Sequence, residues 1–328
     1  MRLLGPGEVR ILEVLSKSEE TSVGQIADKL GITASVVSRE VSKLEKKRLV
    51  MTLRSKVKSV FFSDNSAAIS LQELFSANPH VNFSKVISNS NLQVLSAICY
   101  RDSARMDSIS RVCCLPVVTC RRCLSELGAM GVVWHRNGEY GISLPKLRDF
   151  VCNYCQLLFS LKTGGSRLRS GVVAGPQAVF RMKKDVVGLA PTGSQEYARF
   201  GINLILPDLV DYYAHAFRKP SKPCLEEVVA YGLFENIVFN SPREYSYALL
   251  VIAKNSRKFN WKKFELVTSD LGISQKAGEC RQFFSKDYND NLVNDLPGVG
   301  LACPSRSEFM ELCRQYGVDT KTIFKKRY

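Results

Sequence analysis

The stretch SVGQIADKLGITASVVSREVSKLEKKRLV, residues 22–50, decides the fold of the first part of the chain. Its serine and the preceding Thr21 form a good N-terminal cap for the helix that VGQIADKL predicts. Gly31 suits the left-handed backbone that ends a helix. After a turn at residues 32–35 a further helix is expected. Its apolar side consists of Val37, Val41 and Leu44. A short helix, a tight turn and a second helix with a small polar and basic outer face predict a helix-turn-helix.

The segments on either side complete the unit. Val9, Leu12 and Leu15 recur at helical spacing, which predicts an amphipathic helix before the quoted stretch. After it, residues 49–53 and 57–62 have the pattern of two strands joined by a short turn. This hairpin is the expected wing of a winged helix-turn-helix. Its basic residues are Arg54, Lys56 and Lys58.

The charge of this region favours a polyanionic partner. The chain carries a net charge of +15, from 46 lysines and arginines against 31 aspartates and glutamates. Between residues 33 and 59 there are eight basic side chains and only two acidic ones, Glu40 and Glu45. Net charge alone does not choose among DNA, RNA and an acidic membrane surface, but charge on a helix-turn-helix and its wing favours duplex DNA.

The quoted stretch resembles the winged helix-turn-helix regulators of the MarR and ArsR type. The resemblance covers residues 8–63 well and residues 91–145 more loosely. It implies that the outer face of the second helix of the motif enters the major groove and that the wing meets phosphate. The candidate DNA-binding residues are Ser35, Val36, Ser38, Arg39, Ser42, Lys43 and Lys46 in the helix and Arg54, Lys56 and Lys58 in the wing.

An internal repeat predicts a second unit of the same kind. Residues 8–50 fall on residues 91–133 without a gap, and the apolar positions coincide almost throughout. Asn137-Gly138 between alternating residues is the strongest short signal for a hairpin. The matching outward residues are Val118, Thr119, Arg121, Arg122 and Ser125, with Arg136 in the wing.

Three departures weaken the second copy as a DNA-binding unit. Cys114 stands where Gly31 stood, Cys123 replaces Glu40, and the second wing is nearly neutral. Binding to DNA, a role as a spacer and a role in dimerisation therefore all stay open for this unit.

The repeat and the composition divide the chain into five parts and predict an α+β fold class. The parts are a winged helix-turn-helix at 1–64, a helical linker at 65–90, a second winged helix-turn-helix at 91–145, a connecting helix at 146–165 and a C-terminal α+β domain at 166–328. The linker helix spans residues 66–78. The connecting helix has a broad apolar stripe, which either forms a homodimer or packs on the chain's own C-terminal domain.

The C-terminal part reads as a small sheet followed by helices. Strands are expected at 171–174, 178–182, 202–206 and 211–217, and helices at 195–200, 225–236, 245–255, 261–271 and 274–284. The segments LAPTGSQEYARFGINLI, KPCLEEVVAYGLFE and YSYALLVIAKN are similar to the C-terminal regions of certain archaeal winged-helix proteins, and more distantly to AbiEi-type antitoxins and their nucleotidyltransferase-like relatives. These motifs have low specificity, and the resemblance implies no firm activity.

The C-terminal part lacks the residue patterns of the enzymes it resembles. Gly193-Ser194 is not followed by the paired aspartates that hold Mg²⁺ in a nucleotidyltransferase. Asp208 and Asp211 fall on opposite faces of an extended stretch. Glu226 and Glu227 open a helix, where acidic residues favour the macrodipole. We therefore expect no catalysis, and a role in sensing a small molecule or contacting a protein partner.

Among the eleven cysteines, two pairs have a spacing typical of metal sites, but the internal repeat argues against metal binding. Cys120 and Cys123, like Cys152 and Cys155, are separated by two residues. However, Cys120 aligns with Val37, a core position, and the second pair falls on a long helix. Zinc binding and a redox-sensing thiol are the weaker alternatives. His80, His135 and His215 are scattered and are expected at the surface or in turns. We expect no metal and no cofactor.

These observations favour a sequence-specific, double-stranded DNA-binding transcriptional regulator. The alternatives are an enzyme in which winged helices target a degenerate nucleotidyltransferase- or nuclease-like domain, and a scaffold whose winged helices bind proteins. No run approaches the ~20 apolar residues of a membrane span, and the N-terminus lacks a signal-peptide pattern. We therefore expect a cytoplasmic protein with reduced thiols and no membrane partner.

Overall fold

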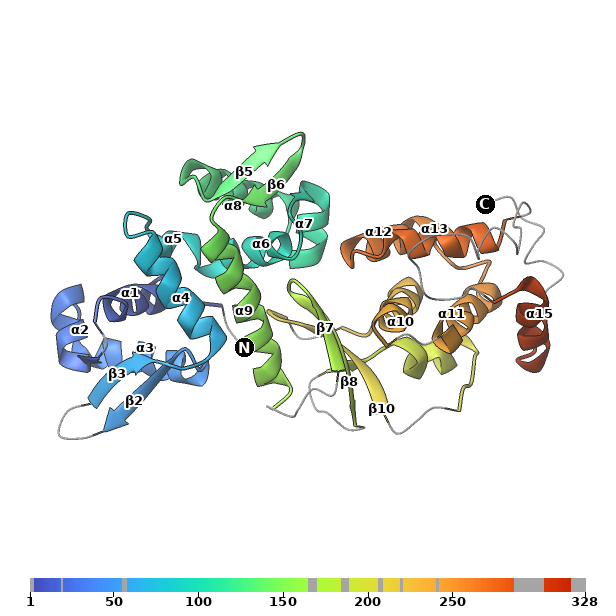
Figure 1. The fold of residues 1–328 in the computed structure, drawn as a ribbon, viewed down its shortest axis with the longest axis horizontal. Coiled ribbons are helices and arrows are strands. Elements are labelled where there is room, and N and C mark those ends of the chain that lie inside the picture. Colours follow the sequence, from blue (N-terminus) through green and yellow to red (C-terminus); the bar gives the residue numbers. More distant parts are fainter. Residues whose placement is uncertain are drawn as a thin grey trace. The chain divides into compact units, whose positions relative to one another are not determined.

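The chain divides into two compact units, which we describe separately. Unit 1 comprises Met1–Ser166 with Ala216–Arg218, and unit 2 comprises Arg167–His215 with Lys219–Tyr328 (Figure 1). The computed structural model describes residues 3–18, 20–54, 58–164, 170–183, 189–205, 209–218, 221–239, 242–285 and 304–319.

The first part of unit 1 is a winged helix-turn-helix. Its elements are α1 (Pro6–Leu15), β1 (Thr21–Ser22), α2 (Val23–Leu30), α3 (Ala34–Lys46), β2 (Val50–Arg54) and β3 (Lys58–Phe62). The strands form an antiparallel sheet in the order β1-β3-β2. The expected helix, helix-turn-helix and hairpin are all present, because the apolar stripes of the three helices meet in one core.

Local capping bonds set the boundaries that the sequence predicts. The hydroxyl of Ser22 accepts a hydrogen bond from the Gln25 N–H (3.2 Å), and the Gln25 side chain accepts one from the Ser22 N–H (2.9 Å). Gly31 ends α2 with φ of +63°. The hydroxyl of Thr33 accepts from the Val36 N–H at the start of α3.

The second part of unit 1 repeats this order of elements. It consists of α6 (Asn89–Cys99), β4 (Ala104–Arg105), α7 (Met106–Cys113), α8 (Val117–Ala129), β5 (Val133–Arg136) and β6 (Glu139–Ile142). The sheet order β4-β6-β5 is that of the first sheet. Asn137 and Gly138 have φ of +51° and +77°, which closes the hairpin between β5 and β6 as the Asn-Gly pair predicts.

Two helices join the two parts of unit 1. The linker helix α4 (Ser66–Ala77) packs against the connecting helix α9 (Pro145–Lys162), and α9 also packs against α6. A four-residue helix, α5 (Phe83–Val86), precedes α6. The apolar stripe of α9 is buried at Leu147, Phe150, Val151, Tyr154, Leu158 and Phe159. This stripe is therefore used inside unit 1, which corrects both sequence-based interpretations of it.

Unit 2 combines a four-stranded antiparallel sheet with helices, so the α+β fold class is confirmed. Its elements are β7 (Ser170–Ala174), β8 (Gln177–Lys183), β9 (Ala190–Pro191), the 3-10 helix η1 (Gly193–Phe200), β10 (Leu209–His215), α10 (Leu225–Phe239), α11 (Pro242–Lys254), α12 (Trp261–Asp270), α13 (Ser274–Phe283) and α15 (Arg306–Gln315). The sheet order is β7-β8-β10-β9.

The core of unit 2 surrounds α10, which packs against η1, α11 and α12. Gly232 permits the closest of these contacts, because a Cβ atom there would lie 2.2 Å from the Tyr197 Oη. Two sequence-based expectations are wrong here. Residues 202–205 form no strand, and Ile202 is instead buried in the helical core. His215 is a buried residue of β10 rather than a surface or turn residue.

The turn before α8 stores backbone strain that a single substitution should relieve. Cys114 ends α7 with φ of +54°, the left-handed conformation that Gly31 adopts at the matching position. A side chain in this conformation costs about 1 kcal/mol. Cys114→Gly should therefore raise the unfolding free energy of unit 1 by about 1 kcal/mol in urea titrations followed by Trp134 fluorescence in a Trp261→Phe background.

The matched reverse change is Gly31→Ala, which should lower the same free energy by about 1 kcal/mol. Equal stability of Cys114→Gly and the parent would contradict a strained turn.

Candidate nucleic-acid interface

The outer face of α3 presents three exposed cations, Arg39, Lys43 and Lys46. The side chain of Arg39 is 68% exposed and that of Lys43 is 46% exposed. Ser35 and Lys46 are also exposed, whereas Val36, Ser38 and Ser42 are half-buried. The Ser42 hydroxyl donates to the Ser38 carbonyl oxygen (2.9 Å), so it is already engaged with its own helix. Reach toward a ligand is therefore greatest at Arg39, Lys43 and Lys46.

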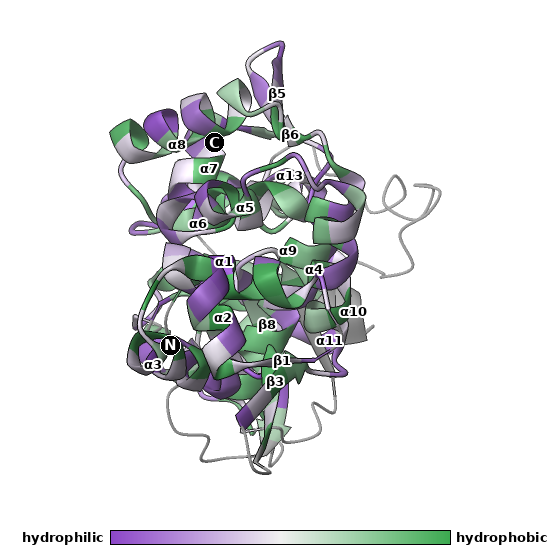
Figure 2. Ribbon diagram, turned by 90° about the vertical axis from the view of Figure 1, so that its left-hand side faces the viewer, coloured by the Kyte–Doolittle hydropathy of each residue, from purple (hydrophilic) through white to green (hydrophobic). Residues whose placement is uncertain are grey.

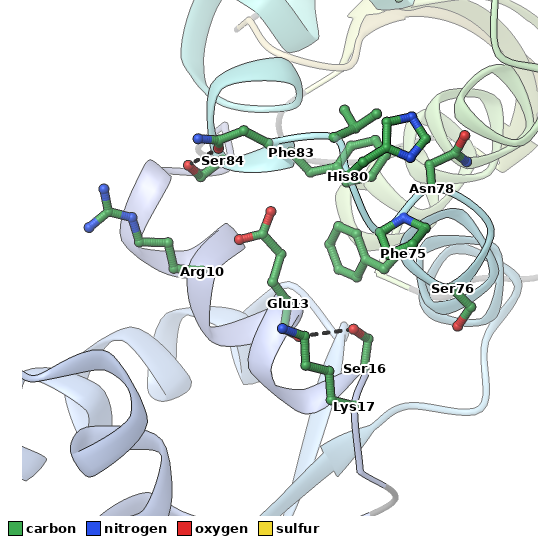
Figure 3. Close-up of a pocket in the computed structure, with 13 residues that line it drawn as sticks. Arg10, Glu13, Ser16, Lys17, Phe75, Ser76, Asn78, His80, Phe83 and Ser84 are labelled. Carbon is green, nitrogen blue, oxygen red and sulfur yellow. Dashed lines mark hydrogen bonds between the residues drawn. The ribbon is translucent and has the colours of Figure 1, made fainter.

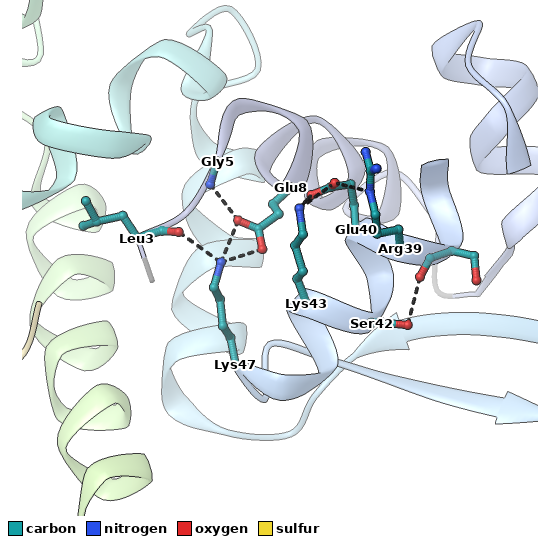
Figure 4. Close-up of polar contacts among 9 residues, drawn as sticks. Leu3, Gly5, Glu8, Arg39, Glu40, Ser42, Lys43 and Lys47 are labelled. Carbon is teal, nitrogen blue, oxygen red and sulfur yellow. Dashed lines mark hydrogen bonds and ion pairs between the residues drawn. The ribbon is translucent and has the colours of Figure 1, made fainter. Parts of the chain in front are cut away.

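Glu40 lies between two of these cations, Arg39 and Lys43, and binds both. The Arg39 Nε lies 3.4 Å from the Glu40 Oε1, and the Lys43 Nζ lies 2.8 Å from the same atom (Figure 4). Ion pairs with one exposed partner are screened by water and contribute about 0–1 kcal/mol. A phosphate group with its full negative charge can therefore replace the Glu40 carboxylate as the partner of either cation.

Lys47, one of the eight basic residues between residues 33 and 59, is buried and does not add to the exposed charge. Its ammonium group is buried and donates to both oxygens of Glu8 (2.5 and 2.6 Å) and to the Leu3 carbonyl oxygen (3.0 Å; Figure 4). Burial lowers the pKa of Lys47, and its bond to Glu8 opposes that shift. The internal repeat indicates the burial of Lys47, because Lys47 aligns with the apolar Met130 and Glu8 aligns with the neutral Asn91.

The N-terminal segment connects α3 to the second part of unit 1. Leu4 is fully buried, and its carbonyl oxygen accepts a hydrogen bond from the Asn89 N–H (2.9 Å). The Gly5 N–H donates to Glu8 (2.6 Å). Residues 3–8 thus bind the end of α3 through Lys47 and the beginning of α6 through Asn89.

Of the basic residues of the first wing, Lys58 is the one whose side chain the structure describes. The Lys58 Nζ lies 3.6 Å from a Glu45 oxygen, and the Thr52 hydroxyl donates to the other oxygen of Glu45 (2.5 Å). Leu53 is 58% exposed on β2, which leaves an apolar side chain beside the cations. Lys56 and the side chain of Arg54 lie outside the described residues.

The outer face of α8 is exposed but carries less net charge. Val118 is 75% exposed, and Arg121, Arg122 and Ser125 are exposed, whereas Thr119 is half-buried. Arg122 lies 3.9 Å from Glu126. In the second wing the Arg136 guanidinium lies over the Trp134 ring, 5.9 Å from its centre. Arg121, Arg122 and the apolar Val118 are therefore the main exposed side chains of this face.

Figure 2 draws α3 and α8 on the same side of the view, with the strands of the two hairpins at opposite ends of unit 1.

The thiols of unit 1 pack as apolar groups. Cys113 and Cys120 are both fully buried, and their Sγ atoms lie 3.6 Å apart. Burial and this contact raise the pKa of Cys113, while the same contact lowers the pKa of Cys120. Cys152 and Cys155 lie on α9, as expected. Among the described residues no group of three or more histidine, cysteine or acidic side chains could hold a metal ion.

A cavity of about 490 Å³ lies between α1 and the segment that follows α4 (Figure 3). Glu13, His80 and Phe83 are among its lining residues. Burial raises the pKa of Glu13, and the backbone N–H groups of Ser84 and Phe83 partly oppose that shift. The cavity combines one carboxylate with Arg10 and Lys17, so it has both charge signs on its wall.

Three acidic side chains of unit 2 bind neighbouring groups, whereas one oxygen of Glu244 is buried without a hydrogen-bond partner among the described residues. Asp211 is buried and accepts two hydrogen bonds from Arg181 (2.7 and 3.1 Å). Glu227 accepts from the Cys224 N–H at the start of α10 (2.8 Å), and Glu226 accepts from the Asn260 N–H before α12 (2.9 Å). Both glutamates lie in the first turn of α10, at the helix start where the sequence places them. Asp208 lies outside the described residues.

Comparison with known proteins supports a regulator in general terms. Residues 4–56 match the model of the MarR family, a family of DNA-binding transcriptional regulators whose members commonly act as dimers. The match covers α1 to β2 and supports a winged-helix regulator for this part of the chain. No curated protein matches the chain. Within the described part of the chain, no helix has the length and apolar character needed to cross a membrane.

Removal of Glu8 should destabilise unit 1 strongly, because it leaves the Lys47 ammonium buried without a counter-charge. We expect Glu8→Gln to cost about 3–5 kcal/mol of unfolding free energy. Glu73→Gln is the matched control, since Glu73 binds Lys146 at 2.5 Å with both side chains half exposed, and it should cost at most about 1 kcal/mol.

The double variant Glu8→Asn/Lys47→Met installs the residues of the second copy and should recover most of the loss. Urea unfolding followed by Trp134 fluorescence in a Trp261→Phe background measures the unfolding free energies of Glu8→Gln, Glu73→Gln and the double variant. A Glu8→Gln variant within 1 kcal/mol of the parent would contradict a buried charged pair.

Proposed function

We propose that the protein is a sequence-specific transcriptional regulator that binds double-stranded DNA, with α3 in the major groove and the first wing on phosphate. The observation that carries this proposal is the exposed cationic face of α3, at Arg39, Lys43 and Lys46, beside a basic hairpin. An arginine on such a face can read guanine, and serine hydroxyls can bind phosphate or base edges.

The exposure of the outer faces of α3 and α8 favours binding to DNA over a role as a protein-binding scaffold. A scaffold would be favoured if other parts of the chain covered the outer faces of both α3 and α8. Instead, the long cations of α3 and Arg121 and Arg122 of α8 are open to solvent. These residue types bind phosphate with a strong dependence on salt.

The tandem arrangement supports a contact with two half-sites by one chain. We propose that residues 1–64 and 91–145 act as two winged helix-turn-helix domains, joined by the linker at 65–90. The connecting helix at 146–165 buries its apolar stripe within unit 1, where it would otherwise be available to a second protomer. The second domain thus takes the place that a partner subunit has in a dimeric regulator, and a homodimer would occupy a longer site.

We propose that the C-terminal domain, residues 166–328, is non-catalytic and contacts a small molecule or a protein partner. Asp211 is buried and neutralised by Arg181, and the two glutamates of α10 accept hydrogen bonds from backbone N–H groups at helix starts. These bonds favour a structural role for these three acidic groups over metal-assisted chemistry.

Arg39→Ala should weaken specific binding by about 1–3 kcal/mol if the guanidinium reads a base. Gel shifts on genomic fragments that the full-length chain retains would measure the change against a non-specific duplex. Arg314→Ala is the matched control, because Arg314 is also an exposed helical arginine bound to a neighbouring glutamate. Unchanged specific affinity in Arg39→Ala would remove this residue from the interface.

Wing substitutions should weaken binding to all sequences alike. Lys56→Gln and Lys58→Gln should each reduce the slope of log K against log salt by about 0.9, because each removes one phosphate contact. Lys262→Gln, at an exposed lysine of α12, should leave the slope unchanged. A loss confined to one DNA sequence would show that the wing reads bases instead of phosphate.

A further inference from the structure

A groove of about 730 Å³ lies between the two halves of unit 1 and shares one residue, Arg122, with the outer face of α8. Its walls come from the first turns of α1, the segment from α5 into α6, and one side of α8. Both α1 and α6 begin here, so the positive ends of two helix dipoles lie at the groove. The groove thus lies where α1, which packs on α3, approaches α8.

Three exposed cations from three different elements line this groove. They are Arg10 of α1, Lys85 of α5 and Arg122 of α8. Among the described residues, neither Arg10 nor Lys85 forms an ion pair, and the acidic residue of the groove, Glu126, lies 3.9 Å from Arg122 with both side chains exposed. The groove therefore has an excess of positive charge that its own side chains do not neutralise.

The remainder of the wall is polar and neutral. Asn82 and Asn89 are exposed and Ser90 is half-buried, whereas the Ser84 hydroxyl and the Asn91 amide are buried and already donate hydrogen bonds within the protein. Exposed hydroxyl and amide groups, with arginine and lysine, are the ones that contact the sugar-phosphate backbone of DNA without reading its sequence. The three cations come from three different elements, α1, α5 and α8.

We propose that this groove binds the DNA backbone between the two half-sites, with Arg10, Lys85 and Arg122 on successive phosphates. The proposal rests on the proposed function and deepens it. Arg122 belongs both to the outer face of α8 and to the groove, and α1 packs directly on α3. The phosphate contacts therefore extend from one recognition helix to the other, and one chain binds a continuous duplex rather than two separate short sites.

The test compares the full-length protein with the Arg10→Gln/Lys85→Gln variant, which leaves both recognition helices intact. Fluorescence anisotropy on a duplex selected by the parent should show a slope of log K against log salt reduced by about 2, since each phosphate contact contributes about 0.9. The ratio of specific to non-specific affinity should stay unchanged. Arg257→Gln/Lys258→Gln removes the same two residue types from the surface of unit 2 and should not alter the slope.

Duplexes with neutral methylphosphonates between the half-sites supply a second readout. They should weaken binding by the parent and have little further effect on Arg10→Gln/Lys85→Gln. An unchanged slope, or an equal drop in the control pair, would overturn the groove contact while leaving the proposed function intact. A parent protein that binds no duplex would overturn both.

Discussion

The buried ion pair between Lys47 and Glu8 is the interaction on which the organisation of unit 1 depends. Lys47 stands at the end of α3 and Glu8 in the first turns of α1, so the pair fixes the recognition helix against the helix that supports it. The same ammonium binds the Leu3 carbonyl oxygen, and the next carbonyl along the chain accepts from Asn89. Because a buried charge without a partner is costly, this set of bonds forms as a whole or is lost as a whole.

The position of the outer face of α3 follows from the buried pair of Lys47 and Glu8. With the end of α3 held, Glu40 binds both Arg39 and Lys43 on the outer face of the helix. The packing of α4 on α9 holds the second part of unit 1 on the same unit. Under the proposed function the two halves meet one duplex together, and the proposed groove contact joins them.

The sequence predicted the local elements well because each one has its own chemical signal. Caps at Ser22 and Thr33, a left-handed residue at Gly31 and the Asn-Gly hairpin act over a few residues, and the repeat extended them to the second copy. The sequence failed where long-range packing decides. Lys47 was counted among the basic residues of the helix and wing although it is buried, residues 202–206 were assigned to a strand, and the α9 stripe was assigned to a dimer or to the C-terminal domain. Arg10 and Lys85 were not singled out, because only the fold places them beside Arg122.

The most direct test of the central claim is selection of genomic fragments by the full-length chain, followed by hydroxyl-radical footprinting of the fragments that are retained. The account predicts enrichment of a common sequence and a protected region with two strongly protected segments, flanked by weaker protection where the wings bind. Retention of fragments without any shared sequence, or protection of a single short segment, would contradict a regulator that reads DNA with two winged helices in one chain.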